Sequence, residues 1–289
     1  MSTQHFDLVI VGGGMVGASL AIALAGRGLR MALIEAYQPD AESQPSYDDR
    51  AIALAYGTRR IFEALDVWPR LAEATTPIRD IHVSDRGHFG FTRLAAGEEG
   101  VPALGYVVTA RNLGRVLLER LPQIDGLDII APASLLSFEN DEDIVRLDVE
   151  RDGVVTTMST RLLVGADGIN STIREQLDLP VSRWAYGQSA IVTNITPSRP
   201  HRNVAYERFT DTGPVALLPM SEDRCAVVWT VRDEQVDEVL ALDDAAFLAA
   251  FQQRFGYRLG NFLRTGRRAA YPLQLLRARE SVRGRVAVI

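Results

Sequence analysis

A glycine turn near the start of the chain constrains its fold more than any other feature. The turn Gly12–Gly17 has the pattern Gly-x-Gly-x-x-Gly. It follows Leu8–Val11, an apolar run typical of a buried parallel strand, and it precedes Ala18–Ala25, a stretch rich in helix formers. A second apolar run, Met31–Ile34, ends at Glu35. The sequence therefore predicts strand, turn, helix and strand within about 30 residues, the arrangement that binds dinucleotides.

Each residue type in this segment has a predicted task. Gly12 permits the tight turn, Gly14 lets a pyrophosphate approach the backbone, and Gly17 lets helix and strand pack closely. The first helical turn, which contains Val16, presents free N–H groups and the positive end of the helix dipole to phosphates. Glu35 can accept hydrogen bonds from a ribose hydroxyl. A glycine-rich turn in an unrelated α/β domain would leave the position of Glu35 unexplained, but the motif alone does not choose between NAD and FAD.

The composition is that of an ordinary soluble protein. Of 289 residues, 47% are hydrophobic and 24% are charged, which suits one large domain or two modest ones. We expect neither a membrane span nor a signal peptide. The single cysteine, Cys225, excludes an internal disulfide and fits the cytoplasm. Four scattered histidines give no metal-ligand spacing, so no metal is expected.

Charge is distributed unevenly along the chain. The formal net charge is −6, which argues against nucleic-acid binding. From Arg254 to Ile289, however, the sequence has nine arginines and only one acidic residue, Glu280. The chain contains no lysine. This segment fits a solvated face, or a surface for anionic lipid, an acidic partner or the phosphates of a nicotinamide cofactor.

Beyond Glu35 the sequence alternates between segments that predict helices and segments that predict short strands. Apolar periodicity predicts helices at about Tyr56–Leu65, Asn112–Leu121 and Asp243–Phe255. Strands are predicted at Asp80–Asp85, Gly90–Leu94, Leu127–Ile130 and Val145–Glu150, and a further buried parallel strand at Arg285–Ile289. Four more strands, separated by turn residues, indicate an antiparallel sheet: Ser189–Ile195, Val204–Phe209, Val215–Leu218 and Cys225–Val231.

Three other positions are candidates for a site. An apolar strand ends in Gly165-Ala166-Asp167-Gly168, which would place Asp167 and Gly168 at the crevice where dinucleotides bind. The same loop also reads as a helix cap formed by Asn170 or Ser171, and the two interpretations are compatible. Arg50 stands before one predicted helix and Arg111 before another, positions where an arginine is usually just solvated.

These motifs together resemble those of the single-component FAD-dependent aromatic hydroxylases, which have the p-hydroxybenzoate hydroxylase fold. The shared residues are Gly12, Gly14, Gly17, Glu35, Asp49-Arg50, Arg111, Gly165–Gly168 and Ser171. Other stretches resemble the 2-polyprenyl-6-methoxyphenol hydroxylases of ubiquinone biosynthesis. They are Asp49–Leu54, His82–His88, Glu207–Phe209, Gly213-Pro214 and Leu218–Ser221.

The resemblance implies an α/β fold with two domains. A Rossmann-type FAD-binding domain with a parallel sheet would comprise residues 1–76, 104–180 and 281–289. A substrate domain with an antiparallel sheet would comprise residues 77–103 and 181–280. In the sequence, strand–helix alternation gives way to short strands and later returns. This agrees with an FAD-binding domain that is interrupted by the substrate domain.

Roles for individual residues follow from the resemblance. The three glycines with Val16 would hold the FAD pyrophosphate, and Glu35 the adenosine ribose. The flavin side would be lined by Arg50 and Arg111, with Asp167 and Gly168 closing on FAD towards the nicotinamide path. The segment Leu218-Pro219-Met220 would approach the isoalloxazine ring. No catalytic base is identified.

The implied function is hydroxylation of the aromatic ring of a polyprenyl-methoxyphenol with FAD, NAD(P)H and O₂. The flavin would carry the oxygen chemistry, while the protein orients the ring and excludes water. The expected partners are the polyprenyl phenol, other ubiquinone-biosynthesis proteins and the inner face of the membrane. Alternatives are a hydroxylase of another quinone precursor or small phenol, a prenyl reductase, and a non-catalytic FAD-binding subunit. A flavin halogenase would need a lysine that the chain lacks, and flavin absorbance would exclude an NAD-dependent dehydrogenase.

A last expectation concerns the end of the chain. In the resembled family, a glycine-containing loop and further helices follow the strand that corresponds to Arg285–Ile289. Their N–H groups would hold the FAD phosphates and the flavin. We therefore expect the 289-residue chain to be a fragment that binds FAD poorly and lacks hydroxylase activity.

Overall fold

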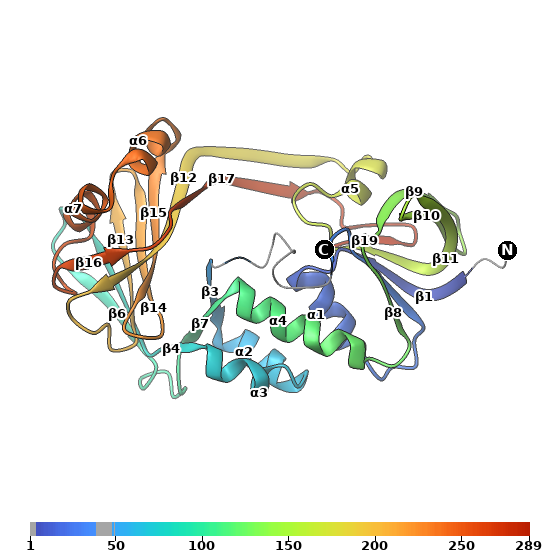
Figure 1. Ribbon diagram of the computed structural model, residues 1–289, viewed down its shortest axis with the longest axis horizontal. Coiled ribbons are helices and arrows are strands. Elements are labelled where there is room, and N and C mark those ends of the chain that lie inside the picture. Colours follow the sequence, from blue (N-terminus) through green and yellow to red (C-terminus); the bar gives the residue numbers. More distant parts are fainter. Residues whose placement is uncertain (1–3, 39–47, 49) are drawn as a thin grey trace. The chain divides into compact units, whose positions relative to one another are not determined.

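The computed structural model describes residues 4–38, 48 and 50–289 (Figure 1). Most of the polar loop before Arg50, including Asp49 of the motif, lies outside these residues. The chain divides into two compact units. The first comprises Met1–Asp49, Ala110–Arg183 and Leu276–Ile289, and the second Arg50–Thr109 and Trp184–Leu275. The long strands β12 (Val181–Pro197) and β17 (Ala269–Ala278) carry the chain from one unit into the other.

A parallel sheet forms the centre of the first unit. Its strand order is β18-β19-β11-β1-β2-β8. The strands are β1 (Gln4–Val11), β2 (Met31–Ile34), β8 (Leu127–Ile130), β11 (Val154–Gly165), β18 (Val282–Arg283) and β19 (Val286–Val288). All these neighbours pair in parallel except β18 with β19. Every residue of β2 is buried, as expected when both faces of a parallel sheet are covered. The parallel strand predicted near the end of the chain is confirmed as β19.

Helices and an antiparallel extension complete this unit. Helices α1 (Met15–Ala23) and α4 (Ala110–Arg120) contact each other and lie side by side in Figure 1. Strand β11 also pairs with β10 (Val145–Arg151), which pairs with β9 (Ser134–Asn140), and α5 (Thr172–Gln176) follows β11. Because β1, β2 and β11 are parallel, their carboxyl ends meet at one edge, and the glycine turn lies at that edge.

The main sheet of the second unit is mostly antiparallel. Its order is β16-β12-β15-β14-β13-β5-β6. The strands besides β12 are β5 (Asp80–Asp85), β6 (Phe91–Ala95), β13 (Val204–Thr210), β14 (Gly213–Pro219), β15 (Cys225–Arg232) and β16 (Phe262–Thr265). Strands β13 and β5 pair in parallel, which the sequence did not predict. Helix α7 (Asp244–Phe255) follows the short helix α6 (Val236–Ala241) and packs on one face, where its phenylalanines meet Trp229.

A three-stranded sheet, β3-β7-β4, lies in the same unit. It consists of β3 (Ala51–Ala55), β7 (Gly105–Thr109) and β4 (Thr76–Ile78), and helices α2 (Tyr56–Ala64) and α3 (Trp68–Leu71) follow β3. A small apolar cluster joins this sheet to the larger one. Its buried members are Ile78, Val107 and Ala205, with Leu218 and Met220 packed against them.

Two details differ from the sequence-based expectations. Residues 50–76 and 104–109 group with the second unit, whereas the sequence placed them in the dinucleotide-binding domain. The reason is strand pairing, since β7 pairs with both β3 and β4. Arg50 directly precedes β3, a strand that the sequence did not predict, whereas helix α2 begins at Tyr56 as expected. The division into an FAD-binding domain and a substrate domain stays a prediction.

Candidate functional site

The glycine turn in the first unit is packed so tightly that there is no room for a side chain at Gly12 or Gly17. Gly12 has a φ of +102°, and a Cβ on it would lie 2.4 Å from the carbonyl oxygen of Ala166. A Cβ on Gly17 would lie 1.9 Å from the carbonyl oxygen of Gly12. The turn is held by hydrogen bonds from Gly12 N to Ile34 O at 2.8 Å and from Ala166 N to Val11 O at 2.7 Å. The N-terminus of α1 therefore approaches the ends of β1 and β11 closely.

Helix α1 begins at this turn with its polar end available. Gly14 is the N-cap residue, no side chain caps the helix, and no acidic residue lies in its first turn. The first N–H groups of a helix carry a partial positive charge and lack partners within the helix. Val16, in that first turn, is 55% exposed although it is apolar. The geometry suits an anion at this position.

Glu35 is held rigidly at the end of β2. Its side chain is buried, and each carboxylate oxygen accepts one backbone N–H group. Oε2 accepts from Gly13 N at 2.5 Å, and Oε1 accepts from Tyr37 N at 2.9 Å. A carboxylate can accept about four hydrogen bonds, so Glu35 can still receive hydroxyl groups of a ligand. The negative charge of Glu35 also disfavours a phosphate group on a ribose bound at this position.

Asp167 occupies the loop between β11 and α5. Its Oδ2 accepts a hydrogen bond from Ile173 N at 3.3 Å. Its Oδ1 is buried and has no hydrogen-bond partner among the described residues. Ser171 is the N-cap residue of α5 and accepts from Arg174 N at 3.0 Å, so the predicted cap is confirmed. An unpartnered carboxylate oxygen is costly to bury and fits a ligand that donates a hydrogen bond.

These residues line one cavity of about 500 Å³ in the first unit. Six of the predicted cofactor-binding residues are among its walls, namely Gly12, Gly14, Val16, Glu35, Asp167 and Gly168. The remaining walls are Val11, Met15, Ile34, Ala36, Tyr37, Ala133, Ser134, Leu135, Ala166 and Thr172. Its size is typical of a ligand pocket, and its walls are apolar with a few convergent polar groups. Such a cavity can hold a nucleoside whose phosphates reach the start of α1.

Comparison with known proteins gives this geometry a family. A family model described as "FAD binding domain" matches residues 5–288. The chain belongs to this family. Because this family is defined by FAD binding, the match agrees with FAD as the cofactor expected from the sequence.

Two relatives with assigned names illustrate the branch within the FAD-binding domain family. The chain is 38% identical over 283 residues to the ubiquinone hydroxylase UbiL of Rhodospirillum rubrum, covering 98% of this chain and 65% of that protein. It is 28% identical over 295 residues to the 3-demethoxyubiquinol 3-hydroxylase of Escherichia coli, covering 100% of this chain and 73% of that protein. The chain thus spans about two thirds of the length of these relatives.

A solved structure confirms the fold class. The p-nitrophenol 4-monooxygenase PnpA of Pseudomonas putida superposes with a TM-score of 0.78 at 17% identity. The match covers 100% of this chain and 72% of that one. At this identity the likeness establishes the mixed α/β fold, as the sequence predicted, and nothing of the substrate.

The other predicted site residues lie elsewhere. Gly17 lies behind the cavity wall, in contact with the turn. Arg111 lies in the first turn of α4, not before the helix as predicted, and its N–H donates to Asp48 O at 2.8 Å. Arg50, in the second unit, has its guanidinium 4.8 Å from the centre of the Tyr271 ring. Leu218 and Pro219 end β14 of that unit, and Met220 follows the strand.

The cavity also contains residues that sequence reasoning missed. Tyr37 follows Glu35, and Ala133–Leu135 follow β8. The strand Leu127–Ile130 was predicted, and it pairs in parallel with β2. Residues just beyond it could therefore have been placed at the same edge of the sheet as Glu35.

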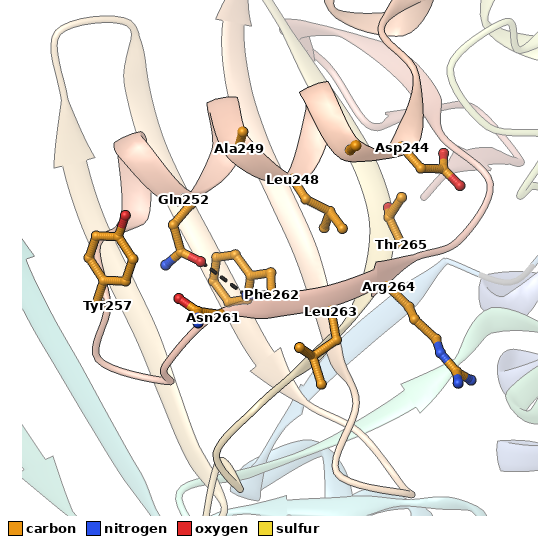
Figure 2. A pocket seen from close by; sticks show the side chains of 11 residues that line it. Asp244, Leu248, Ala249, Gln252, Tyr257, Asn261, Phe262, Leu263, Arg264 and Thr265 are labelled. Atoms are coloured by element: carbon orange, nitrogen blue, oxygen red, sulfur yellow. Dashed lines mark hydrogen bonds between the residues drawn. The ribbon is translucent and has the colours of Figure 1, made fainter.

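A second hollow, of about 740 Å³, lies in the second unit between α7 and β16 (Figure 2). Leu248 and Ala249 of α7 face β16, and Gln252 Oε1 accepts from Phe262 N at 3.0 Å. The side chains that line it are mostly small, apolar or amide-bearing. Although larger, this hollow contains neither the glycine turn nor Glu35 and Asp167, the two carboxylates that line the cavity of the first unit.

No described helix has the length and apolar character needed to cross a bilayer. Within residues 4–38, 48 and 50–289, no three His, Cys, Asp or Glu side chains are grouped so that they could bind a metal ion.

Proposed function

We propose that this chain is the FAD-binding part of a flavin-dependent monooxygenase that hydroxylates the aromatic ring of a polyprenyl phenol in ubiquinone biosynthesis. The cavity built on the glycine turn, Glu35 and Asp167 carries the proposal. The family match and the names of the two relatives support the reaction class.

The residues present fit the adenosine and pyrophosphate half of FAD. Close approach at Gly12 and Gly17 leaves the N–H groups of α1 as the nearest donors to the phosphates. Glu35 would accept the ribose hydroxyls, because its two N–H donors fix the orientation of its carboxylate. Asp167 would accept a hydroxyl of the cofactor through Oδ1, its unpartnered oxygen.

The other proposed roles concern the flavin ring and the substrate. When bound, FAD supplies electron transfer from NAD(P)H and the activation of O₂. Arg50 and Arg111 would lie along the flavin side of the cofactor. Leu218, Pro219 and Met220 would cover the ring and keep water away. Leu218 and Met220 pack on an apolar cluster with Ile78 and Val107, which supports this water-excluding role.

A polyprenyl chain is dissolved in membrane lipid, so the proposed enzyme must meet its substrate at a bilayer surface. We therefore propose a cytoplasmic protein that contacts the membrane peripherally and works beside other proteins of ubiquinone biosynthesis.

Binding and catalysis can be tested separately. ADP carries the adenosine and pyrophosphate without the flavin, so calorimetric titration with ADP measures the cavity alone. We expect wild-type protein to bind ADP and FAD in competition, and Glu35→Gln to weaken both. A protein that binds FAD but not ADP would contradict the placement of the adenosine in this cavity.

The reaction class needs an activity assay. Full-length protein loaded with FAD is given NAD(P)H and either a prenylated phenol or a small hydrophilic phenol, and the products are identified by mass spectrometry. We expect ring hydroxylation of the prenylated phenol. Faster turnover of the small phenol would favour the alternative hydroxylase, while bound FAD without NAD(P)H oxidation would favour a non-catalytic subunit.

A further inference from the structure

An aromatic hairpin tip projects from the larger sheet of the second unit. Strands β5 and β6 pair antiparallel, and β6 is the last strand of the sheet. Residues Arg86–Gly90, called the tip below, join them. Gly87 and Gly90 have positive φ values of 88° and 110°, and the Phe89 side chain between them is fully exposed.

Apolar side chains continue on both faces of this hairpin. Phe91, 67% exposed, stacks on His82 with ring centres 4.7 Å apart. Phe209, 49% exposed, lies at the end of the neighbouring strand β13. Phe91 is paired with Ser84 and Phe209 with Asp85. Because successive residues of β5 point to opposite faces, the two phenylalanines lie on opposite sides of the sheet.

Arginines surround the base of the hairpin. Arg86 lies 3.6 Å from Asp211, and Arg93 lies 3.6 Å from Asp80. Arg254 also pairs with Asp211, and Arg258 donates to Ser84 Oγ at 3.2 Å. Burial, and then the charges of Arg258 and Arg86, lower the pKa of Arg208. Among the described residues here, these five arginines stand against four acidic residues, Asp80, Asp85, Glu207 and Asp211, so a small positive excess remains.

We propose that the tip inserts Phe89 into the interface of an anionic lipid bilayer, with the arginines at the headgroup phosphates. The inference rests on the proposed function, because that function places the substrate's polyprenyl chain in the membrane. It adds that the protein contacts the membrane through the tip.

A bilayer fits the tip better than a protein partner does. A flat protein surface would cover one face of the hairpin, whereas lipid surrounds apolar side chains on both faces and at the apex. Aromatic rings and arginines together are typical of interfacial contacts. Insertion must be shallow, because the outer edge of β6 pairs with no other strand among the described residues, and its backbone groups need water or headgroup partners.

A site-specific fluorescent label tests the insertion directly. The natural Cys225 is buried, and burial raises the pKa of its thiol to about 12, so an introduced cysteine reacts selectively. Phe89→Cys is labelled with an environment-sensitive dye and mixed with phosphatidylglycerol–phosphatidylcholine vesicles. Trp184→Cys, at another aromatic position that is 67% exposed, is the matched control. We expect a blue shift and quenching by lipid-borne quenchers at position 89 and no change at position 184.

Co-sedimentation measures the contribution of the same side chain to affinity. We expect Phe89→Ser to lower partitioning into anionic vesicles about tenfold, Trp184→Ser to leave it unchanged, and pure phosphatidylcholine vesicles to bind weakly. Equal binding by Phe89→Ser and wild type, or an unresponsive label at position 89, would overturn the proposal. So would a label that responds to an added protein and not to vesicles. Neither assay uses flavin or substrate. A negative result in these two assays would therefore leave the proposed reaction standing, and a failure to detect that reaction would not affect the test of membrane insertion.

Discussion

Replacing Gly17 by alanine is the sharpest test of how the turn is built. The new Cβ would lie 1.9 Å from the carbonyl oxygen of Gly12, whereas ordinary contacts of this kind begin at 3.4 Å. The turn cannot simply move away. Gly12 lies against Ala166, and its own N–H is bonded to Ile34 O at 2.8 Å. Helix α1 must therefore shift away from the strands.

The expected energy can be estimated from the two opposing effects. Overpacking of this kind costs about 1–3 kcal/mol, and the overlap here places the cost near the upper end. Alanine recovers up to about 1 kcal/mol through its better helix propensity. We expect a net loss of about 2 kcal/mol, together with loss of ADP binding, because the phosphate-facing N–H groups move.

Urea denaturation and ADP calorimetry together measure both consequences. Gly57→Ala is the matched control, because Gly57 lies in helix α2 and a Cβ there would meet nothing within 4 Å. We expect this variant to keep full ADP affinity and to be slightly more stable, by about 0.5 kcal/mol. A Gly17→Ala protein as stable as wild type, with unchanged ADP affinity, would refute the reasoning about the turn.

Three further predictions concern single side chains. Glu35→Gln removes a charged acceptor and should weaken ADP binding at least tenfold by calorimetry, since a charge-assisted hydrogen bond contributes about 1.5–3 kcal/mol; unchanged affinity would exclude Glu35 as the ribose acceptor. Burial raises the pKa of Glu207, so its charge opposes folding. Glu207→Gln should therefore raise the urea midpoint at pH 7, with a difference that shrinks as the pH falls towards 4; a lower midpoint at pH 7 would count against this account. Arg50→Ala should cut hydroxylation sharply in full-length, FAD-loaded protein while circular dichroism stays unchanged, whereas wild-type turnover would end its assignment to the flavin.

Local patterns in the sequence were sufficient for the elements that carry the cavity. The apolar runs at Leu8–Val11, Met31–Ile34 and Leu127–Ile130 lie in β1, β2 and β8. Strand β2 is buried throughout and β1 over most of its length, whereas β8 is only partly buried; in each case the signal lies within the segment. Glu35 and Asp167 could be placed because residues at the carboxyl ends of parallel strands share one edge.

Long-range pairing could not be read in the same way. The parallel pairing of β13 with β5 joins segments more than a hundred residues apart. Strands β16 and β17 lie in the arginine-rich segment, and their apolar and polar residues do not alternate regularly; β17 also contains a proline, Pro272, which argues against a strand. Ala51–Ala55 is rich in alanine, a helix former, yet pairing with β7 makes it a strand. The grouping of residues 50–76 with the second unit follows from that pairing.

The roles of the candidate residues depend on a bound nucleotide, and a crystal structure with FAD at saturating concentration tests them most directly. The account predicts electron density for the adenosine in the cavity of the first unit. The pyrophosphate should lie within about 3 Å of the first N–H groups of α1, the distance of a hydrogen bond, and a ribose hydroxyl should contact Glu35. Density for the adenosine at any other place, with this cavity left free of ligand, would contradict the central claim.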